Sequence, residues 1–305
     1  MTASIDLCEV GPRDGLQNLA RHFSVAERIE LIDRLSAAGV RHVEAVSFVN
    51  PKRVPQMADA EAVLAGIARP AGLEVAGLVM NERGAERAMA CALDEVRFVL
   101  IASETFSQRN QGASVAQNVT ALTGVAGLMR GSKRKLTAVI GASYGCPFEG
   151  RIAPDVVRAL ADQAIAAGAE EISLADTIGV ATPAQVDRLT RMVRADHPDV
   201  TLGGHFHNTR NMGFANAYAA VLAGATVLDA SIGGLGGCPF APKATGNIAT
   251  EDLLYLLEGL QLDTPLRPLA AIDVANWLRE LVPADLSGRL AIAGWFPAVA
   301  RDSRN

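Results

Sequence analysis

Short runs of apolar and β-branched residues alternate along the chain with longer stretches in which apolar and polar positions are mixed. Apolar runs of about four to eight residues are typical of strands that are buried on both faces. We therefore expect strands over residues 5–10, 42–46, 73–79, 96–101, 136–140, 171–174, 200–205 and 226–230.

The mixed stretches between these runs repeat their apolar residues every three or four positions. That period predicts amphipathic helices with one face on a core. Thr182 before Pro183 is typical of an N-cap followed by proline at the first helical position. The helices are expected over residues 25–38, 55–67, 82–92, 113–129, 154–167, 183–194, 212–223 and 250–260.

Eight strand–helix units in sequence predict an α/β fold, a (β/α)8 TIM barrel over residues 1–260. A doubly wound sheet is the alternative, but it usually carries a glycine-rich phosphate loop after its first strand. Here that turn reads GPRDG, at residues 11–15. Residues 261–305 exceed what the barrel needs, and their amphipathic segment 269–281 predicts a C-terminal helical extension. We expect it to pack on the barrel or on a partner subunit.

Composition and charge narrow the range of partners. The 305 residues are 50% hydrophobic and have a net charge of -5, which argues against nucleic-acid and membrane-surface binding. The chain has no apolar run of about 18 residues, so no transmembrane helix is expected. Acidic residues in the first apolar run argue against a secretory signal, and the four scattered cysteines are expected to be free thiols. Both features favour a cytoplasmic protein.

Reactive side chains collect just after the predicted strands, which is where the active site of a barrel lies. The predicted helices carry ordinary solvated charges by contrast. The residues at the strand ends and in the loops that follow are Glu9, Arg13, Asp14, Glu44, Asp176, Thr177, His205, His207, Cys238 and Asn247.

His205 and His207 form the most informative pair, because strand residues at i and i+2 project to the same face. Two imidazoles and an oxygen from Asp14 would suit a divalent ion such as Mg, Mn, Co or Zn. Ligand type alone does not choose among these metals. The alternative is that His205 is a core residue and His207 a solvated loop residue.

The loop at residues 233–239 has four glycines in five positions and then displays Cys238. A thiol beside a metal or an arginine can act as an acid or a base, because nearby positive charge lowers its pKa. A small apolar plug is the alternative role for Cys238. Arg13 and Asp14 could form only a surface ion pair, but their place after a buried strand favours a function.

Several segments of the chain resemble the 3-hydroxy-3-methylglutaryl-CoA lyase family. The resemblance runs from residue 5 to about residue 260. The GLGGCP stretch and its continuation at 246–252 resemble the signature loop that separates these lyases from isopropylmalate and homocitrate synthases. The matching segments are 9–18, 47–52, 54–57, 145–150, 176–180 and 234–260.

The resemblance implies a TIM barrel that binds Mg or Mn and cleaves 3-hydroxy-3-methylglutaryl-CoA to acetyl-CoA and acetoacetate by a retro-Claisen mechanism. It also implies a homodimer or a higher homo-oligomer. Arg13 would stabilise the enolate, since positive charge must meet the charge that develops on the thioester oxygen. By position, the metal ligands would be Asp14, His205, His207 and Asn247, and the acid–base groups Glu44, Asp176 and Cys238.

The chain departs from the family pattern beside the second histidine. The lyases usually continue with Asp-Thr-Tyr-Gly, whereas residues 208–211 read NTRN. A carboxylate is therefore lost and a cation gained, and we hypothesise that Asn208 and Arg210, with Gln17, bind a different acyl group. A lyase or aldolase acting on another 3-hydroxyacyl-CoA or on a 4-hydroxy-2-oxo acid is thus an alternative. A non-catalytic binding barrel is a further one.

An acyl-CoA substrate would bring phosphates to a protein with net negative charge. We expect a local basic patch at the mouth of the barrel, because phosphates need cations nearby. The alternative for each residue of this patch is that it is an ordinary solvated charge. The candidate residues are Lys52, Arg53, Arg109 and Lys243, of which Lys52 and Lys243 are the predicted substrate contacts.

Overall fold

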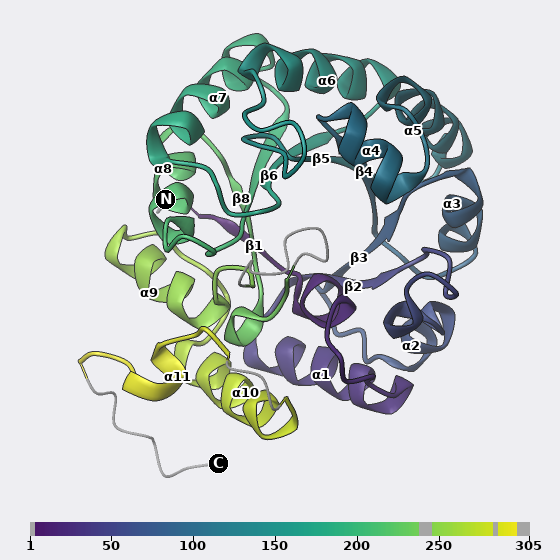
Figure 1. Ribbon diagram of the computed structural model, residues 1–305. Coiled ribbons are helices and arrows are strands. Elements are labelled where there is room, and N and C mark those ends of the chain that lie inside the picture. The colour runs from purple at the N-terminus through teal and green to yellow at the C-terminus, as the bar shows by residue number, and fades with distance from the viewer. Residues whose placement is uncertain (1–3, 238–245, 283–285, 298–305) are drawn as a thin grey trace.

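The computed structural model describes residues 4–237, 246–282 and 286–297. Eight parallel strands form a closed barrel in chain order, and β8 pairs with β1 to complete it (Figure 1). The predicted (β/α)8 barrel is confirmed. The strands are β1 Asp6–Glu9, β2 His42–Ser47, β3 Glu74–Val79, β4 Glu95–Ile101, β5 Lys135–Gly141, β6 Glu171–Asp176, β7 Thr201–Phe206 and β8 Val227–Ala230.

Helices surround the barrel and cover the outer face of its strands (Figure 1). Apolar residues on their inner faces pack against the outward side chains of the strands in one continuous core. The helices of the ring are α1 Val25–Ala38, α2 Ala60–Gly66, α3 Glu82–Met89, α4 Glu104–Gln111, α5 Val115–Met129, α6 Pro154–Ala167, α7 Pro183–Asp196, α8 Gly213–Leu222 and α9 Thr250–Gly259.

Two helical segments differ from the prediction. The helix expected over 55–67 is divided into a 3-10 turn at Pro55–Met57 and α2, because Asp59 between them has a left-handed backbone. Helix α4 was not expected. Its sequence is polar around most of its circumference, and it buries only Phe106 and Ser107, so it gives almost no apolar period.

On the β4 side, the interior of the barrel is charged toward the N-terminal ends of the strands and apolar toward its mouth. Because strand side chains alternate, Arg97, Val99 and Ile101 of β4 point to the axis, whereas Phe98 packs outward. Glu95 and Arg97 are fully buried and paired with other charged groups from neighbouring and opposite strands. These ion pairs satisfy a layer that apolar side chains fill in many barrels.

The chain after α9 forms α10 (Pro268–Leu281) and the short α11 (Leu290–Ala293). Helix α10 lies against α1 and α9 (Figure 1), and Arg34 of α1 stacks on Trp277 with 4.6 Å from Cζ to the ring centroid. The helix expected over 269–281 is therefore present. The division into a barrel domain and a separate extension stays a prediction. In the described ranges, no helix combines the length and apolar character needed to cross a membrane.

Candidate active site

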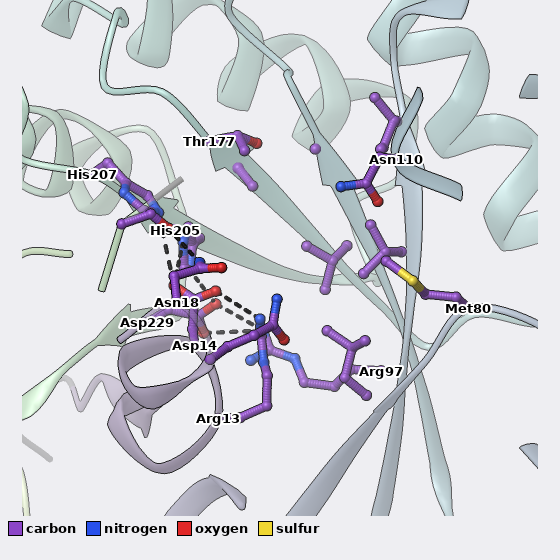
Figure 2. A pocket seen from close by; sticks show the side chains of 18 of the residues that line it. Arg13, Asp14, Asn18, Met80, Arg97, Asn110, Thr177, His205, His207 and Asp229 are labelled. Atoms are coloured by element: carbon purple, nitrogen blue, oxygen red, sulfur yellow. Dashed lines mark hydrogen bonds and ion pairs between the residues drawn. The ribbon is translucent and has the colours of Figure 1, made fainter. Parts of the chain in front are cut away.

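The chain leaving β1 forms η1 (Gly11–Gly15), a single turn of π-helix. The backbone N–H groups of Arg13, Asp14 and Gly15 all donate to the carbonyl oxygen of Val10, at 3.2, 2.7 and 3.2 Å. Isolated π turns often occur at functional sites. Here the turn presents Arg13 and Asp14 side by side at the mouth of the barrel (Figure 2).

Asp14 lies between the two histidines at the end of β7. Its Oδ2 is 4.0 Å from Nε2 of His205 and 3.8 Å from Nε2 of His207. One donor atom from each of the three residues lies within 4.8 Å of the others. Burial would raise the pKa of Asp14, but Arg13 and the two imidazoles hold that pKa well below its usual range. The carboxylate is thus ionised and available as a ligand.

Asn247, the fourth predicted ligand, is hydrogen-bonded to Asp14. Its Nδ2 donates to Oδ2 of Asp14 at 2.8 Å and to the carbonyl oxygen of Leu235 at 2.9 Å. Its Oδ1 is buried and accepts no hydrogen bond from the described residues. A buried acceptor of this kind is costly unless another group binds it. Two imidazole nitrogens, a carboxylate and an amide oxygen therefore fit a divalent cation.

A glycine brings the neighbouring loop close to this amide. Gly236 has φ of +130°, and a Cβ at this position would lie 2.6 Å from Nδ2 of Asn247. Asn18 ties the same loop to the turn after β1, since its Nδ2 donates to the carbonyl oxygen of Gly237 at 2.8 Å. The part of the glycine-rich loop at Gly236 and Gly237 is therefore packed closely against the site.

Glu44 of β2 holds the guanidinium of Arg13. Its Oε2 accepts from Nε of Arg13 at 2.7 Å and lies 2.5 Å from Nη2, while Nη1 donates to Oδ1 of Asp14 at 2.6 Å. Burial would lower the pKa of Arg13, but Glu44 and Asp14 raise it above its ordinary value. The site therefore contains a fixed and permanent positive charge beside the predicted metal ligands.

A cavity of about 140 Å³ opens next to these groups. Arg13, Asp14 and the two histidines line one side, together with Gln17. Thr177 and Asn110 lie across the opening (Figure 2). The opposite wall is apolar and comes from β3 and the residue after it, from β4, from β5 and from α4. It consists of Leu78, Met80, Val99, Ile101, Phe106 and Val139.

Asp176 lies at the end of β6 but is engaged with backbone. Its oxygens accept from the N–H groups of Val180 and Ala181, each at 2.9 Å, and it is buried. Burial raises its pKa despite these two bonds. Asp176 thereby fixes the loop that follows β6, and its predicted acid–base role stays a prediction.

The two residues that depart from the family pattern also contact backbone. Oδ1 of Asn208 accepts from the N–H of Gly213 at 3.1 Å, at the start of α8. Arg210 is exposed and donates to the carbonyl oxygens of Ile178 and Gly179, at 3.3 and 2.8 Å. Arg210 is thus placed on the rim above β6, and the wall of the cavity includes a different arginine, Arg97.

The predicted basic patch is dispersed. Lys52 lines a separate hollow of about 570 Å³ between the loops after β2 and β3, where Arg83 and Arg87 also lie. Arg53 is exposed nearby. Arg109 stacks on the ring of Phe148, with 4.2 Å from its Cζ to the ring centroid. Cys238 and Lys243 lie outside the described residues.

Sequence reasoning missed two charged residues that reach the site from within strands. Arg97 and Asp229 both line the cavity and pair with each other. The available signal was charged residues at inward positions of mostly apolar strands, in EVRFVLI and in VLDA. Burying a charge is costly unless it is paired, so a charged residue at such a position is a candidate for a role in the interior of the barrel.

Known proteins share this fold and much of this sequence. Residues 4–277 match the HMGL-like family model. The chain is 42% identical over 301 residues to (R)-citramalyl-CoA lyase of Chloroflexus aurantiacus, with 95% of each chain covered. It is 43% identical over 289 residues to 3-hydroxy-3-isohexenylglutaryl-CoA/hydroxy-methylglutaryl-CoA lyase of Pseudomonas aeruginosa, covering 95% of this chain and 96% of that one. An HMG-CoA lyase from Acinetobacter baumannii, in complex with coenzyme A and 3-methylmalate, superposes with a TM-score of 0.93 at 38% identity, covering 99% and 100% of the two chains.

Proposed function

This chain belongs to the HMGL-like family and is a carbon–carbon lyase, and we propose that it cleaves 3-hydroxy-3-methylglutaryl-CoA to acetyl-CoA and acetoacetate. The observation that carries the proposal is the meeting of Asp14, His205 and His207 beside Arg13. These groups would supply a cation site and a fixed positive charge at one opening of the barrel. Relatives named for this reaction share 41% and 43% identity with the chain.

A divalent metal, Mg or Mn in the first place and Zn or Co as alternatives, would be held by Asp14, His205, His207 and Asn247. The ionised Asp14 supports this assignment, and so does Oδ1 of Asn247, which has no hydrogen-bond partner among the described residues. When bound, the metal would polarise the hydroxyl and carboxylate oxygens of the substrate.

Arg13 would meet the charge that the reaction produces. Removal of the hydroxyl proton lets the carbon–carbon bond break, and its electron pair moves onto the thioester, forming an enolate oxygen. A guanidinium held in place before the reaction stabilises that oxygen without reorganisation. Glu44 contributes by fixing Arg13, since Nε and Nη2 both approach one of its oxygens. We assign the return of a proton to the enolate carbon to Cys238.

Citramalyl-CoA is the second candidate substrate. It carries its carboxylate directly on the carbon that bears the hydroxyl, and cleavage would give acetyl-CoA and pyruvate. A relative with 42% identity is named for this compound. The A. baumannii lyase was solved with 3-methylmalate, an isomer of citramalate. Both observations concern relatives, so the two CoA esters have to be compared directly as substrates of this protein.

The test is an end-point assay of metal-stripped protein with each of the two CoA esters, with and without Mn²⁺, in which products are identified by mass. We expect metal-dependent acetyl-CoA, with acetoacetate as the second product. Arg13→Met should lower kcat by about 10²- to 10³-fold, as loss of one donor to a developing oxyanion does. Arg191→Met, on the exposed face of α7, is the matched control and should retain activity.

Pyruvate in place of acetoacetate would transfer the assignment to citramalyl-CoA. Acetyl-CoA from neither ester would contradict both substrates. Equal activity before and after metal removal would contradict the metal site.

A further inference from the structure

His205 uses its two ring nitrogens in opposite directions. Nδ1 lies 3.1 Å from Oδ2 of Asp229, and Nε2 faces Asp14 (Figure 2). A carboxylate beside Nδ1 accepts the proton on that nitrogen and leaves the lone pair on Nε2. Asp229 therefore selects the tautomer of His205 whose Nε2 can bind a cation at the predicted metal site.

Arg97 holds both oxygens of Asp229. Its Nη2 donates to Oδ1 and to Oδ2, each at 3.0 Å. Arg97 is 0% exposed and Asp229 is 3% exposed. The two residues come from β4 and β8, which are not neighbours in the barrel, so the pair spans its interior. An ion pair shielded from water in this way keeps one geometry.

Arg97 is itself anchored by two further groups. Its Nη1 donates to Sγ of Cys8 at 3.4 Å, and its Nε lies 3.4 Å from Oε1 of Glu95. The guanidinium therefore has partners from β1, β4 and β8. A planar fork with partners on several edges is a geometry that lysine does not reproduce.

We propose that Arg97 and Asp229 act as a positioning pair, which orients His205 and sets the affinity of this protein for its divalent metal. The inference rests on the proposed metal site and is independent of the acyl substrate. A ligand histidine commonly depends on such an outer partner, whose removal costs about 10- to 100-fold in metal affinity or activity. In this chain a second buried residue extends that support across the barrel.

The competing explanation is that the pair only stabilises the fold. Loss of any equally buried arginine would then weaken Mn²⁺ binding to the same extent. Arg28 offers the matched control: it is 2% exposed, it donates from Nη1 to the carbonyl oxygen of Ala58 at 2.7 Å, and it lies on α1 outside the barrel. Arg28→Met removes the same group from an equally buried place.

The experiment measures the Kd of Mn²⁺ for the substrate-free protein by calorimetry, with circular dichroism as the check on folding. We expect Asp229→Asn and Arg97→Met each to weaken Mn²⁺ binding by about 10- to 100-fold. The double variant should lose no more than the weaker-binding single variant, because both residues act through one hydrogen bond to His205. Arg28→Met should bind Mn²⁺ like the unchanged protein.

Arg97→Lys keeps the charge and provides a second variant if Arg97→Met does not fold; it should also weaken Mn²⁺ binding. At saturating Mn²⁺ the folded variants should recover most of their turnover of the CoA ester, because the defect lies in the metal site. Unchanged Mn²⁺ affinity in the folded variants would overturn the positioning role, and so would an equal loss in Arg28→Met. Failure of the unchanged protein to bind Mn²⁺ would overturn the metal site as well.

Discussion

Glu9, the last residue of β1, holds together three parts of the chain around the site. Its carboxylate is fully buried and accepts from the N–H of Gly11 at 2.8 Å, the N–H of Ile232 at 2.9 Å and the hydroxyl of Thr250 at 2.6 Å. Burial outweighs these three bonds and raises the pKa of Glu9 from 4.5 to about 7. A proton on Glu9 is therefore bound more tightly in the folded protein than in the unfolded chain.

This shift predicts a pH-dependent loss of stability that Glu9→Gln reduces. From about pH 4.5 to about pH 7 the folded protein holds a proton that the unfolded chain has released. The free energy of unfolding therefore falls as pH rises through this window and levels off above it. Glu9 contributes roughly 3 kcal/mol to the fall, at 1.36 kcal/mol per pKa unit. The side-chain amide of the variant does not titrate, so urea unfolding at about pH 5 and about pH 8 should show a smaller fall.

Glu30→Gln is the control, because Glu30 lies on the exposed side of α1 and pairs only with Arg34 in the described part of the chain. This variant should keep the slope of the unchanged protein. A Glu9→Gln protein with that same slope would show that another group causes the pH dependence.

Single residues at the site could be predicted from sequence only where a local pattern revealed them. His205 and His207 were found because a strand turns residues i and i+2 to one side. Arg97 and Asp229 were missed, because their meeting depends on two strands on different sides of a closed barrel. Arg210 was assigned to substrate because it replaces an aromatic residue of the family pattern beside the second histidine, and that role stays a prediction. The backbone carbonyls of Ile178 and Gly179 that hold it on the rim are not visible in the sequence.

At the level of elements, the end of α1 and the chain before α10 are packed against each other. Gly39 ends α1 with φ of +117°, and a Cβ there would lie 2.4 Å from the carbonyl oxygen of Pro265. Gly168 ends α6 with nearly the same φ, +116°, but its Cβ would meet only Ala126, at 3.7 Å. The two glycines therefore share one backbone conformation and differ in what surrounds them.

Alanine at these two positions should separate backbone strain from contact with the C-terminal segment. Gly168→Ala carries the strain alone and should cost about 1 to 2 kcal/mol of unfolding free energy. Gly39→Ala must also displace the Pro265 carbonyl and should cost a further 1 to 3 kcal/mol, roughly the cost of overpacking. Chemical denaturation of both variants gives the difference. Equal costs would show that the chain at Pro265 moves aside freely, which would argue against close packing of the extension on α1.

The strands and most helices were predictable because each has one periodic pattern over its whole length. The strands of the barrel are short apolar runs, and α1, α6 and α7 bury regular inner faces. Helix α4 lacked such a pattern, although Phe106 on it reaches the cavity. Elements that serve a site bury little surface, so their sequences carry little of the signal on which prediction depends.

For the molecule as a whole, the candidate metal site joins segments that are distant in sequence. Asp14 follows β1, His205 lies in β7 with His207 directly after that strand, and Asn247 precedes α9. These segments flank β8, whose pairing with β1 closes the barrel. A cation that binds all four residues would therefore connect the first turn of the chain to its last strands. Such a cation binds only where the four residues are together, which is in the folded state.

Mn²⁺ should consequently stabilise the whole barrel against unfolding. At a free concentration about 100 times its Kd, a ligand specific to the folded state adds about 2.7 kcal/mol to the free energy of unfolding. For a chain of this size that corresponds to a rise of roughly 5 °C in Tm, measurable by scanning calorimetry of the metal-stripped protein. His207→Ala, which removes one donor at the end of β7, should lose most of the rise and EDTA should reverse it. A rise of the same size in His207→Ala would place the cation elsewhere on the protein, and the barrel would then owe its closure to strand pairing and core packing alone.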